Sequence, residues 1–73
     1  MTIEKIMETY GTGYDYMVDD GFRGWELGYD DQWHAIGEID WTATNEEVNN
    51  AVIAGIEILD EGIIIVHVDN KLA

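Results

Sequence analysis

The chain has 73 residues with no cysteine and no proline, and 16 acidic residues against three basic ones give a net charge of −13 at pH 7. This length allows one domain at most, residues 1–73, and the lack of cysteine excludes disulfide bonds and thiolate metal sites. Direct binding to DNA or RNA is also excluded, because it needs Lys and Arg to displace counterions. No apolar run approaches the roughly 18 residues of a membrane span, so we expect a soluble cytoplasmic protein.

A short helix is predicted at residues 2–10. Its apolar residues recur at helical spacing and form one stripe: Ile3, Ile6, Met7 and Tyr10. Thr2 suits the N-cap, and Gly11 suits the position after the last turn.

Three segments with alternating apolar and polar residues follow. Residues 14–18 predict a short strand that could lie at the edge of a sheet, and Asp20-Gly21 predicts a turn. Residues 23–29 and 33–41 predict two further strands, which form an antiparallel hairpin or, with the first, a three-strand meander.

The apolar residues predict the register of this hairpin. A loop at residues 30–32 pairs Tyr29 with Trp33, and Trp25 with Gly37, so that the rings share one face. A two-residue loop would pair unlike faces. We therefore expect these residues to form mainly core: Trp25, Leu27, Tyr29, Trp33, Ile39 and Trp41.

The last third of the chain predicts a second helix and a final strand. Thr44 and Glu47 match a capping box, and apolar residues at helical spacing continue to about residue 60. Gly55 within this helix is interpreted as a point of close packing on the sheet. The apolar, β-branched segment 63–68 predicts a central strand covered on both faces. The expected fold is therefore a small α+β domain with one sheet.

The residues that carry chemistry give no catalytic or cofactor-binding motif. His34 and His67 match no metal-ligand spacing, and His67 is interpreted as a partly buried residue with one hydrogen bond. No Ser or Cys is present to act as a nucleophile. We predict no enzyme activity, no cofactor and no metal. The alternative left open is a weak calcium or other cation site among turn aspartates, namely Asp19, Asp20, Asp30 and Asp31.

The remaining signal is the acidic surface. The predicted hairpin places Glu26, Glu38 and Asp40 on the face opposite the rings, with Asp30 and Asp31 at its turn. The predicted second helix extends this surface through Glu46, Glu47, Glu57, Asp60 and Glu61. Such a surface fits a groove that is built to hold nucleic acid, and electrostatic attraction would draw it there. The competing interpretation is that the acids only keep an aromatic-rich protein soluble.

In size, acidity, lack of Cys and Pro, and short α+β layout, the chain resembles the small phage-encoded anti-CRISPR and anti-restriction proteins that mimic DNA. The resemblance covers general character and rests on no motif. It implies an inhibitor that blocks a basic nucleic-acid-binding protein or nuclease complex of a host cell. The alternative is a structural or adaptor module that binds a protein partner through its aromatic residues, or binds itself as a homodimer.

Overall fold

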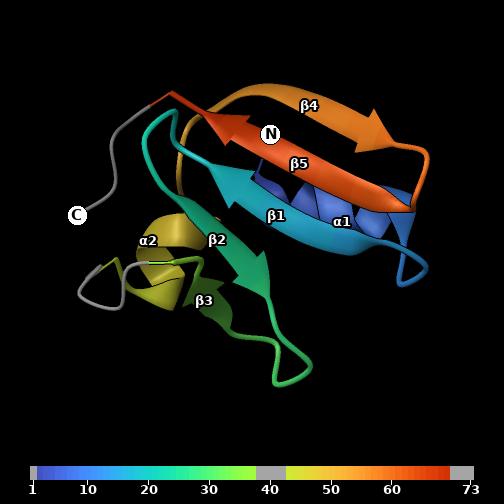
Figure 1. The fold of residues 1–73 in the computed structure, drawn as a ribbon, viewed down its shortest axis with the longest axis horizontal. Coiled ribbons are helices and arrows are strands. Elements are labelled where there is room, and N and C mark those ends of the chain that lie inside the picture. Colours follow the sequence, from blue (N-terminus) through green and yellow to red (C-terminus); the bar gives the residue numbers. More distant parts are fainter. Residues whose placement is uncertain (1, 38–42, 70–73) are drawn as a thin grey trace.

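The computed structural model describes residues 2–37 and 43–69 of the chain. Within these residues the fold is α+β, as predicted, with two helices and one five-stranded sheet (Figure 1). The elements in chain order are α1 Ile3–Tyr10, β1 Asp15–Asp19, β2 Gly24–Leu27, β3 Trp33–Ala35, α2 Asn45–Asn49, β4 Ile53–Leu59 and β5 Ile63–Val68. Among the described residues, no helix is long and apolar enough to span a membrane.

The sheet has the strand order β3-β2-β1-β5-β4, and its only parallel pair within the described residues joins β1 to β5. Both helices lie on one face of the sheet, behind it in Figure 1. The core forms between the helices and this face, and its buried residues are Ile3, Ile6, Tyr16, Val18, Trp25, Trp33, Val48, Ala51, Ile64, Val66 and Val68. The opposite face, which we name the open face, has no helix of the described chain over it.

The N-terminal helix is confirmed as predicted. The Thr2 side chain accepts a hydrogen bond from the backbone N–H of Lys5. Gly11 ends the helix at a φ of 83°, and its N–H donates to the carbonyl of Met7. Ile3 and Ile6 are buried against the sheet, so the apolar stripe is the face that packs.

The predicted second helix begins correctly but is wrong beyond residue 49. The capping box is present, since Thr44 and Glu47 each accept a hydrogen bond from the other's backbone N–H. The helix then ends at Asn49, and residues 53–59 form β4. β-Branched residues favour a strand there, and residues 60–62 form a turn in which Gly62 takes a φ of 80° and donates its N–H to Leu59. The acids at the expected end of the helix therefore belong to a hairpin loop.

Gly55 accordingly lies in a strand, paired with His67 beside an irregularity in the β4–β5 ladder. No atom lies within 4 Å of the position that a Cβ on Gly55 would occupy. The expected close packing of a helix at this glycine is therefore wrong.

The register of the β2–β3 hairpin differs from the predicted one by two residues. Trp33 pairs with Leu27 instead of Tyr29, and Trp25 pairs with Ala35. The loop has the predicted length, but it comprises residues 29–31, closed by a hydrogen bond from the Gly28 N–H to the Gln32 carbonyl. The last loop residue, Asp31, has a φ of 62°, a conformation that Asp tolerates better than Gln.

A shift of two residues keeps every side chain on its predicted face. Trp25 and Trp33 are therefore buried, and Leu27 is partly buried. Tyr29, in contrast, lies in the loop and is fully exposed, so its prediction as core is wrong. Ile39 and Trp41 lie outside the described residues.

Two expectations about the position of strands are also corrected. β1 lies between β2 and β5 and is not an edge strand. β5 is interior, as predicted, but only one of its faces is fully buried, since Ile63, Ile65 and His67 on the open face are half-buried. No helix of the described chain covers that face, because both helices lie on the other face of the sheet.

The phenol of Tyr16 links α1 to the sheet. Tyr16 is buried on β1, and its hydroxyl donates to the carbonyls of Gly11 and Met7 at the end of α1. Burial raises the pKa of Tyr16, and the neighbouring Tyr14 adds to this shift. The neutral phenol is therefore the form that stabilises the fold.

We predict that Tyr16→Phe lowers the free energy of unfolding at pH 7 by about 1 kcal/mol, the usual net value of one hydrogen bond. Because the folded-state pKa is raised, the wild-type stabilisation holds below pH 10 and is lost as the pH rises above it. Urea unfolding at pH 7 and pH 10.5 measures both effects, with Tyr10→Phe on the exposed end of α1 as the control. Equal stability of the wild type and Tyr16→Phe at pH 7 would contradict this role.

Candidate functional site

The open face of the sheet carries carboxylates from three strands. Residues that pair across a ladder point to the same side of the sheet. Met17 pairs with Glu26 and Ile65, and Ile65 pairs with Glu57. One row across the open face therefore runs Glu26, Met17, Ile65, Glu57, with an acid at each side and half-buried apolar side chains between them.

The same face of β1 adds two more acids. Asp15 and Asp19 alternate with Met17 and therefore point in the same direction. Asp15 is exposed and Asp19 is half-buried. Among the described strand residues of the open face, none is Lys or Arg.

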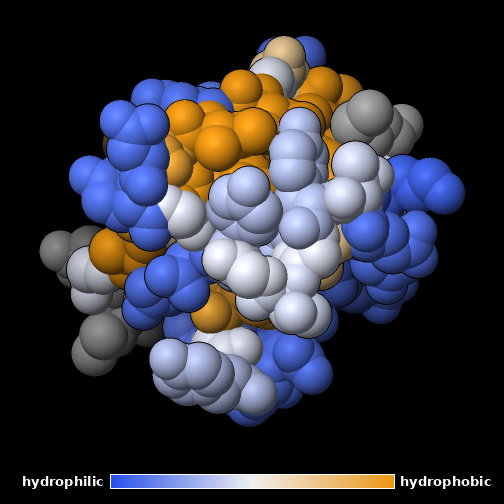
Figure 2. All heavy atoms as spheres, turned by 90° about the vertical axis from the view of Figure 1, so that its right-hand side faces the viewer, coloured by the Kyte–Doolittle hydropathy of each residue, from blue (hydrophilic) through white to orange (hydrophobic). Residues whose placement is uncertain are grey.

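Two acidic loops lie at one end of this sheet. β1 and β5 are parallel, so the β2–β3 loop and the β4–β5 loop project from the end at which β1 and β5 begin. Figure 1 shows the β4–β5 loop on the right and the β2–β3 loop at the bottom of the molecule. They carry Asp30 and Asp31, and Asp60 and Glu61, all exposed. Figure 2, which views this end, shows hydrophilic groups around a paler centre.

The predicted binding residues thus divide into three groups. Glu26 and Glu57 share the open face, and the four loop acids lie at its end. Glu46 and Glu47 lie at the start of α2 on the helix side, where Glu47 completes the capping box, so they do not extend the open face as expected. Glu38 and Asp40 lie outside the described residues.

His67 is the site residue that the sequence did not assign. It projects from β5 one residue before the end of the strand, with Nδ1 3.1 Å from Asp19 Oδ2 and Nε2 3.1 Å from Glu57 Oε1. His67 therefore makes two hydrogen bonds instead of the single one expected, and only an imidazolium can donate both. Glu57 was expected on a helix, so its contact with His67 across a strand pair was not predicted.

The lysine and arginine side chains of the described residues are paired with acids away from the open face, unlike His67. Arg23 lies 3.6 Å from the buried carboxylate of Asp20 in the β1–β2 turn, and its guanidinium lies over the ring of Trp25. Lys5 lies 3.7 Å from Glu8 on the exposed side of α1. Lys5 and Arg23 therefore neutralise local acids and bring no positive charge to the open face.

The expected alternative of a cation site among the turn aspartates is not supported by the geometry. Asp19 and Asp20 lie at the end of β1, whereas Asp30 and Asp31 lie in the loop beyond its start, so the two pairs are at opposite ends of the sheet. In residues 2–37 and 43–69, no group of three or more His, Asp or Glu side chains is arranged to hold a metal ion.

A groove opens where β1 and β2 diverge. Their ladder pairs Met17–Asp19 with Gly24–Glu26 and stops there, and Figure 1 shows the two strands separating beyond this point. The resulting groove has a volume of about 960 Å³ and is bounded by α1 and α2 as well as by the strands. Its lining includes the apolar side chains of Met7, Leu27 and Trp33.

Trp33, which lines this groove, is held in place by α2. Its backbone N–H donates to the side chain of Asn45 at 2.9 Å, and its indole N–H donates to that of Asn49 at 2.8 Å. Four acids also line the groove: Glu4, Asp15, Glu26 and Asp31. None of the described residues that line it is Lys, Arg or His.

Asp30 is tied to His34 across the β2–β3 loop. Both carboxylate oxygens lie 3.0 Å from His34 Nε2. This hydrogen bond, and a second from the Gln32 N–H, lower the pKa of Asp30. The interaction fixes the loop from which Tyr29 and Asp31 project.

We predict that His34→Ala raises the pKa of Asp30 towards the ordinary carboxyl range. Because the folded-state pKa is lowered, the stabilising effect of Asp30 is present above the unfolded-state pKa and is lost as the pH falls through the folded value. A ¹³C NMR titration of the Asp30 carboxyl in both proteins measures the shift. An unchanged Asp30 midpoint in His34→Ala would show that the hydrogen bond does not set this pKa.

Comparison with known proteins finds no relative of this chain. No protein-family model, no curated protein sequence and no solved structure matches the chain. A function can therefore be proposed only from the residues and their arrangement.

Proposed function

We propose that this protein is an acidic inhibitor that mimics nucleic acid and occupies the basic DNA- or RNA-binding site of a host defence complex, of the anti-CRISPR or anti-restriction type. The observation that carries the proposal is the open face, which presents Asp15, Asp19, Glu26 and Glu57 and, in the described strands, no Lys or Arg. Its action is stoichiometric binding in the cytoplasm, without catalysis and without contact with nucleic acid.

The spacing of these charges supports mimicry. Same-face residues on a strand are ~6.7 Å apart and neighbouring strands ~4.8 Å, the first of which is comparable with the phosphate spacing along one nucleic-acid strand. Asp15 and Asp19 are therefore ~13 Å apart on β1, and Glu26 and Glu57, three strands apart, are separated by ~14 Å. Both distances correspond to about two phosphate steps.

The distribution of charge supports rapid capture by a basic partner. With a net charge of −13 on 73 residues, the molecule generates a strong negative field, and such fields raise association rates with positively charged clefts. The half-buried Met17 and Ile65 between the two glutamates add apolar area to the same surface. Charge therefore favours encounter, and the apolar row favours retention.

A second candidate function, a structural or adaptor module, is favoured by one specific observation. β4 is an edge strand, and its residues Ile56 and Ile58 are 37% and 49% exposed although they point to the helix side. Figure 2 shows a hydrophobic patch near the top, on the side of the molecule where β4 runs. Phe22 and Tyr29, 75% and fully exposed, are further apolar contacts. An exposed edge strand of this kind pairs readily with another chain.

The mimicry proposal is tested by capture from a bacterial lysate on the immobilised protein, with and without competing duplex DNA. We expect nucleic-acid-binding proteins to be captured, displaced by DNA, and released steeply between 0.1 and 0.5 M NaCl, since exposed charge pairs are screened. The purified captured protein should lose DNA binding when it is mixed with one equivalent of this chain.

The matched variants remove two charges each. Glu26→Gln/Glu57→Gln on the open face should weaken capture at least about tenfold, since each charged contact contributes on the order of 1 kcal/mol. Glu8→Gln/Glu46→Gln on the helices should change it little. Equal capture by both double variants, or capture unaffected by DNA, contradicts the proposal.

The adaptor candidate predicts the opposite response to salt. Self-association or partner binding through β4 should persist at 0.5 M NaCl and be abolished in Ile56→Lys/Ile58→Lys. Sedimentation velocity at both salt concentrations measures this. A monomer at all protein concentrations, together with salt-sensitive capture, would exclude this function.

A further inference from the structure

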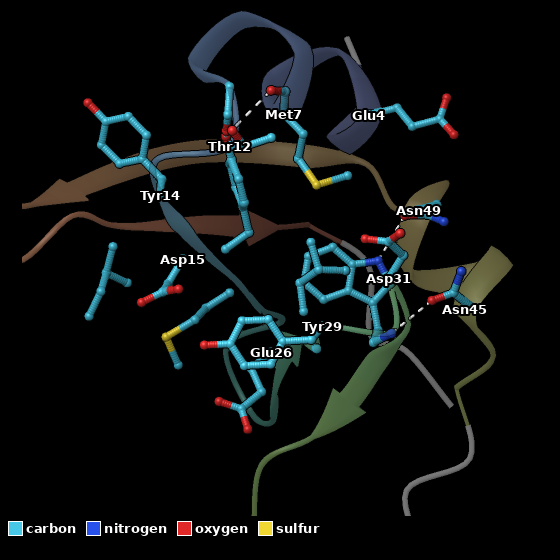
Figure 3. A pocket seen from close by; sticks show the side chains of 17 residues that line it. Glu4, Met7, Thr12, Tyr14, Asp15, Glu26, Tyr29, Asp31, Asn45 and Asn49 are labelled. Atoms are coloured by element: carbon cyan, nitrogen blue, oxygen red, sulfur yellow. Dashed lines mark hydrogen bonds between the residues drawn. The ribbon is translucent and has the colours of Figure 1, made fainter.

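The groove between the diverging ends of β1 and β2 has a chemistry of its own. An apolar floor of Met7, Leu27 and Trp33 lies between acidic side chains, and about 960 Å³ is ample for one long side chain. Figure 3 shows the carboxylates of Asp15 and Glu26 on the strand side and that of Asp31 beside α2. The floor and the rim therefore suit a ligand with an apolar stem and a cationic head.

We propose that this groove binds an arginine side chain of the protein partner. The methylene stem of arginine packs on apolar surface while its head keeps polar partners. The planar guanidinium pairs with carboxylates through two parallel hydrogen bonds and stacks on aromatic rings. Tyr14 and Tyr29 line the groove alongside its acids, so the groove offers a guanidinium both carboxylates and aromatic rings.

Charge decides between the possible occupants. The described lining has four carboxylates and no cationic side chain, so an anionic or purely apolar ligand would leave those acids near a water-excluding surface without compensation. An arginine supplies the compensating charge. Lysine carries the same charge, but its ammonium neither stacks on a ring nor forms the paired hydrogen bonds.

The groove is also built in advance of binding. Trp33 is only 9% exposed and is fixed by Asn45 and Asn49. The Asp30–His34 contact holds the loop that carries Asp31 and Tyr29. Preformed sites lose less conformational entropy when a ligand binds, so a single anchoring side chain can contribute measurable affinity.

This inference rests on the proposed function, since a nucleic-acid-binding partner is rich in the arginines that contact phosphates. It adds the position at which one such arginine would bind, namely the groove. The groove is then the specific contact and the open face the general electrostatic one. They share Asp15 and Glu26, so Asp31, which belongs to the groove alone, and Glu57, which belongs to the open face alone, test them separately.

The test uses the full chain and needs no natural partner. The probe is the peptide acetyl-Gly-Arg-Gly-amide, compared with the peptides in which citrulline or lysine replaces arginine. The indole N–H signal of Trp33 and the methyl signal of Met7 are followed by NMR at low salt. We expect saturable shifts at these residues with the arginine peptide, at least about threefold weaker binding of the lysine peptide, and no binding of the neutral citrulline peptide.

Two single-charge variants localise the effect. Asp31→Asn should weaken arginine binding about tenfold, and it keeps the fold because Asn also tolerates a positive φ. Asp60→Asn, in the other acidic loop and outside the groove, should leave it unchanged. A dispersed NMR spectrum confirms that each variant is folded.

Equal weakening by Asp31→Asn and Asp60→Asn would overturn the inference, because it would show diffuse charge attraction. Equal binding of the citrulline or lysine peptide would also overturn it, as would the lack of saturation. Those results would leave the mimicry proposal intact if capture still depended on Glu57, which lies outside the groove. Conversely, the arginine peptide could bind while no captured protein is displaced by DNA. The inference about the groove would then stand, and the proposed function would be wrong.

Discussion

The parallel pairing of β1 with β5 is the constraint on which the rest of the structure depends. It joins Asp19 to His67, 48 residues away in the chain. It also aligns Tyr16 with Ile64 and Val18 with Val66, and these pairs form the middle of the core. With β1 and β5 fixed, their antiparallel neighbours can only be placed outside them, and both acidic loops must then project from the same end.

Local patterns in the sequence were sufficient for features that local forces determine. The cap of α1, the capping box of α2 and the faces of the strands follow from residues near each other, such as Thr2 with Lys5 and Thr44 with Glu47. The α+β class was predictable for the same reason. These features needed no knowledge of what each element packs against.

The predictions that are wrong concern features determined by residues far apart in the chain. Residues 53–59 fit a helical spacing, but their antiparallel pairing with β5 stabilises a strand, and the isolated segment does not reveal this pairing. The position of the β2–β3 loop depended on which residue takes the left-handed conformation, and Asp31 takes it instead of Gln32. The contact of His67 with Glu57 exists because residues 53–59 form a strand beside β5, and so the sequence could not indicate it. The groove was likewise hidden, because it exists where two strands stop pairing.

The arrangement of the two hairpins has a consequence for how the molecule folds. β2–β3 and β4–β5 are each closed by a short loop, and such hairpins form in about 1–10 μs. The β1–β5 pair closes a much longer segment, and contacts between distant parts of a chain form more slowly. We infer that the two hairpins form before β1 pairs with β5. Asp19 and Glu26 then join Glu57 and His67 only in the last step, and the burial of Tyr16, Val18, Ile64 and Val66 in that same step opposes the repulsion among these acids.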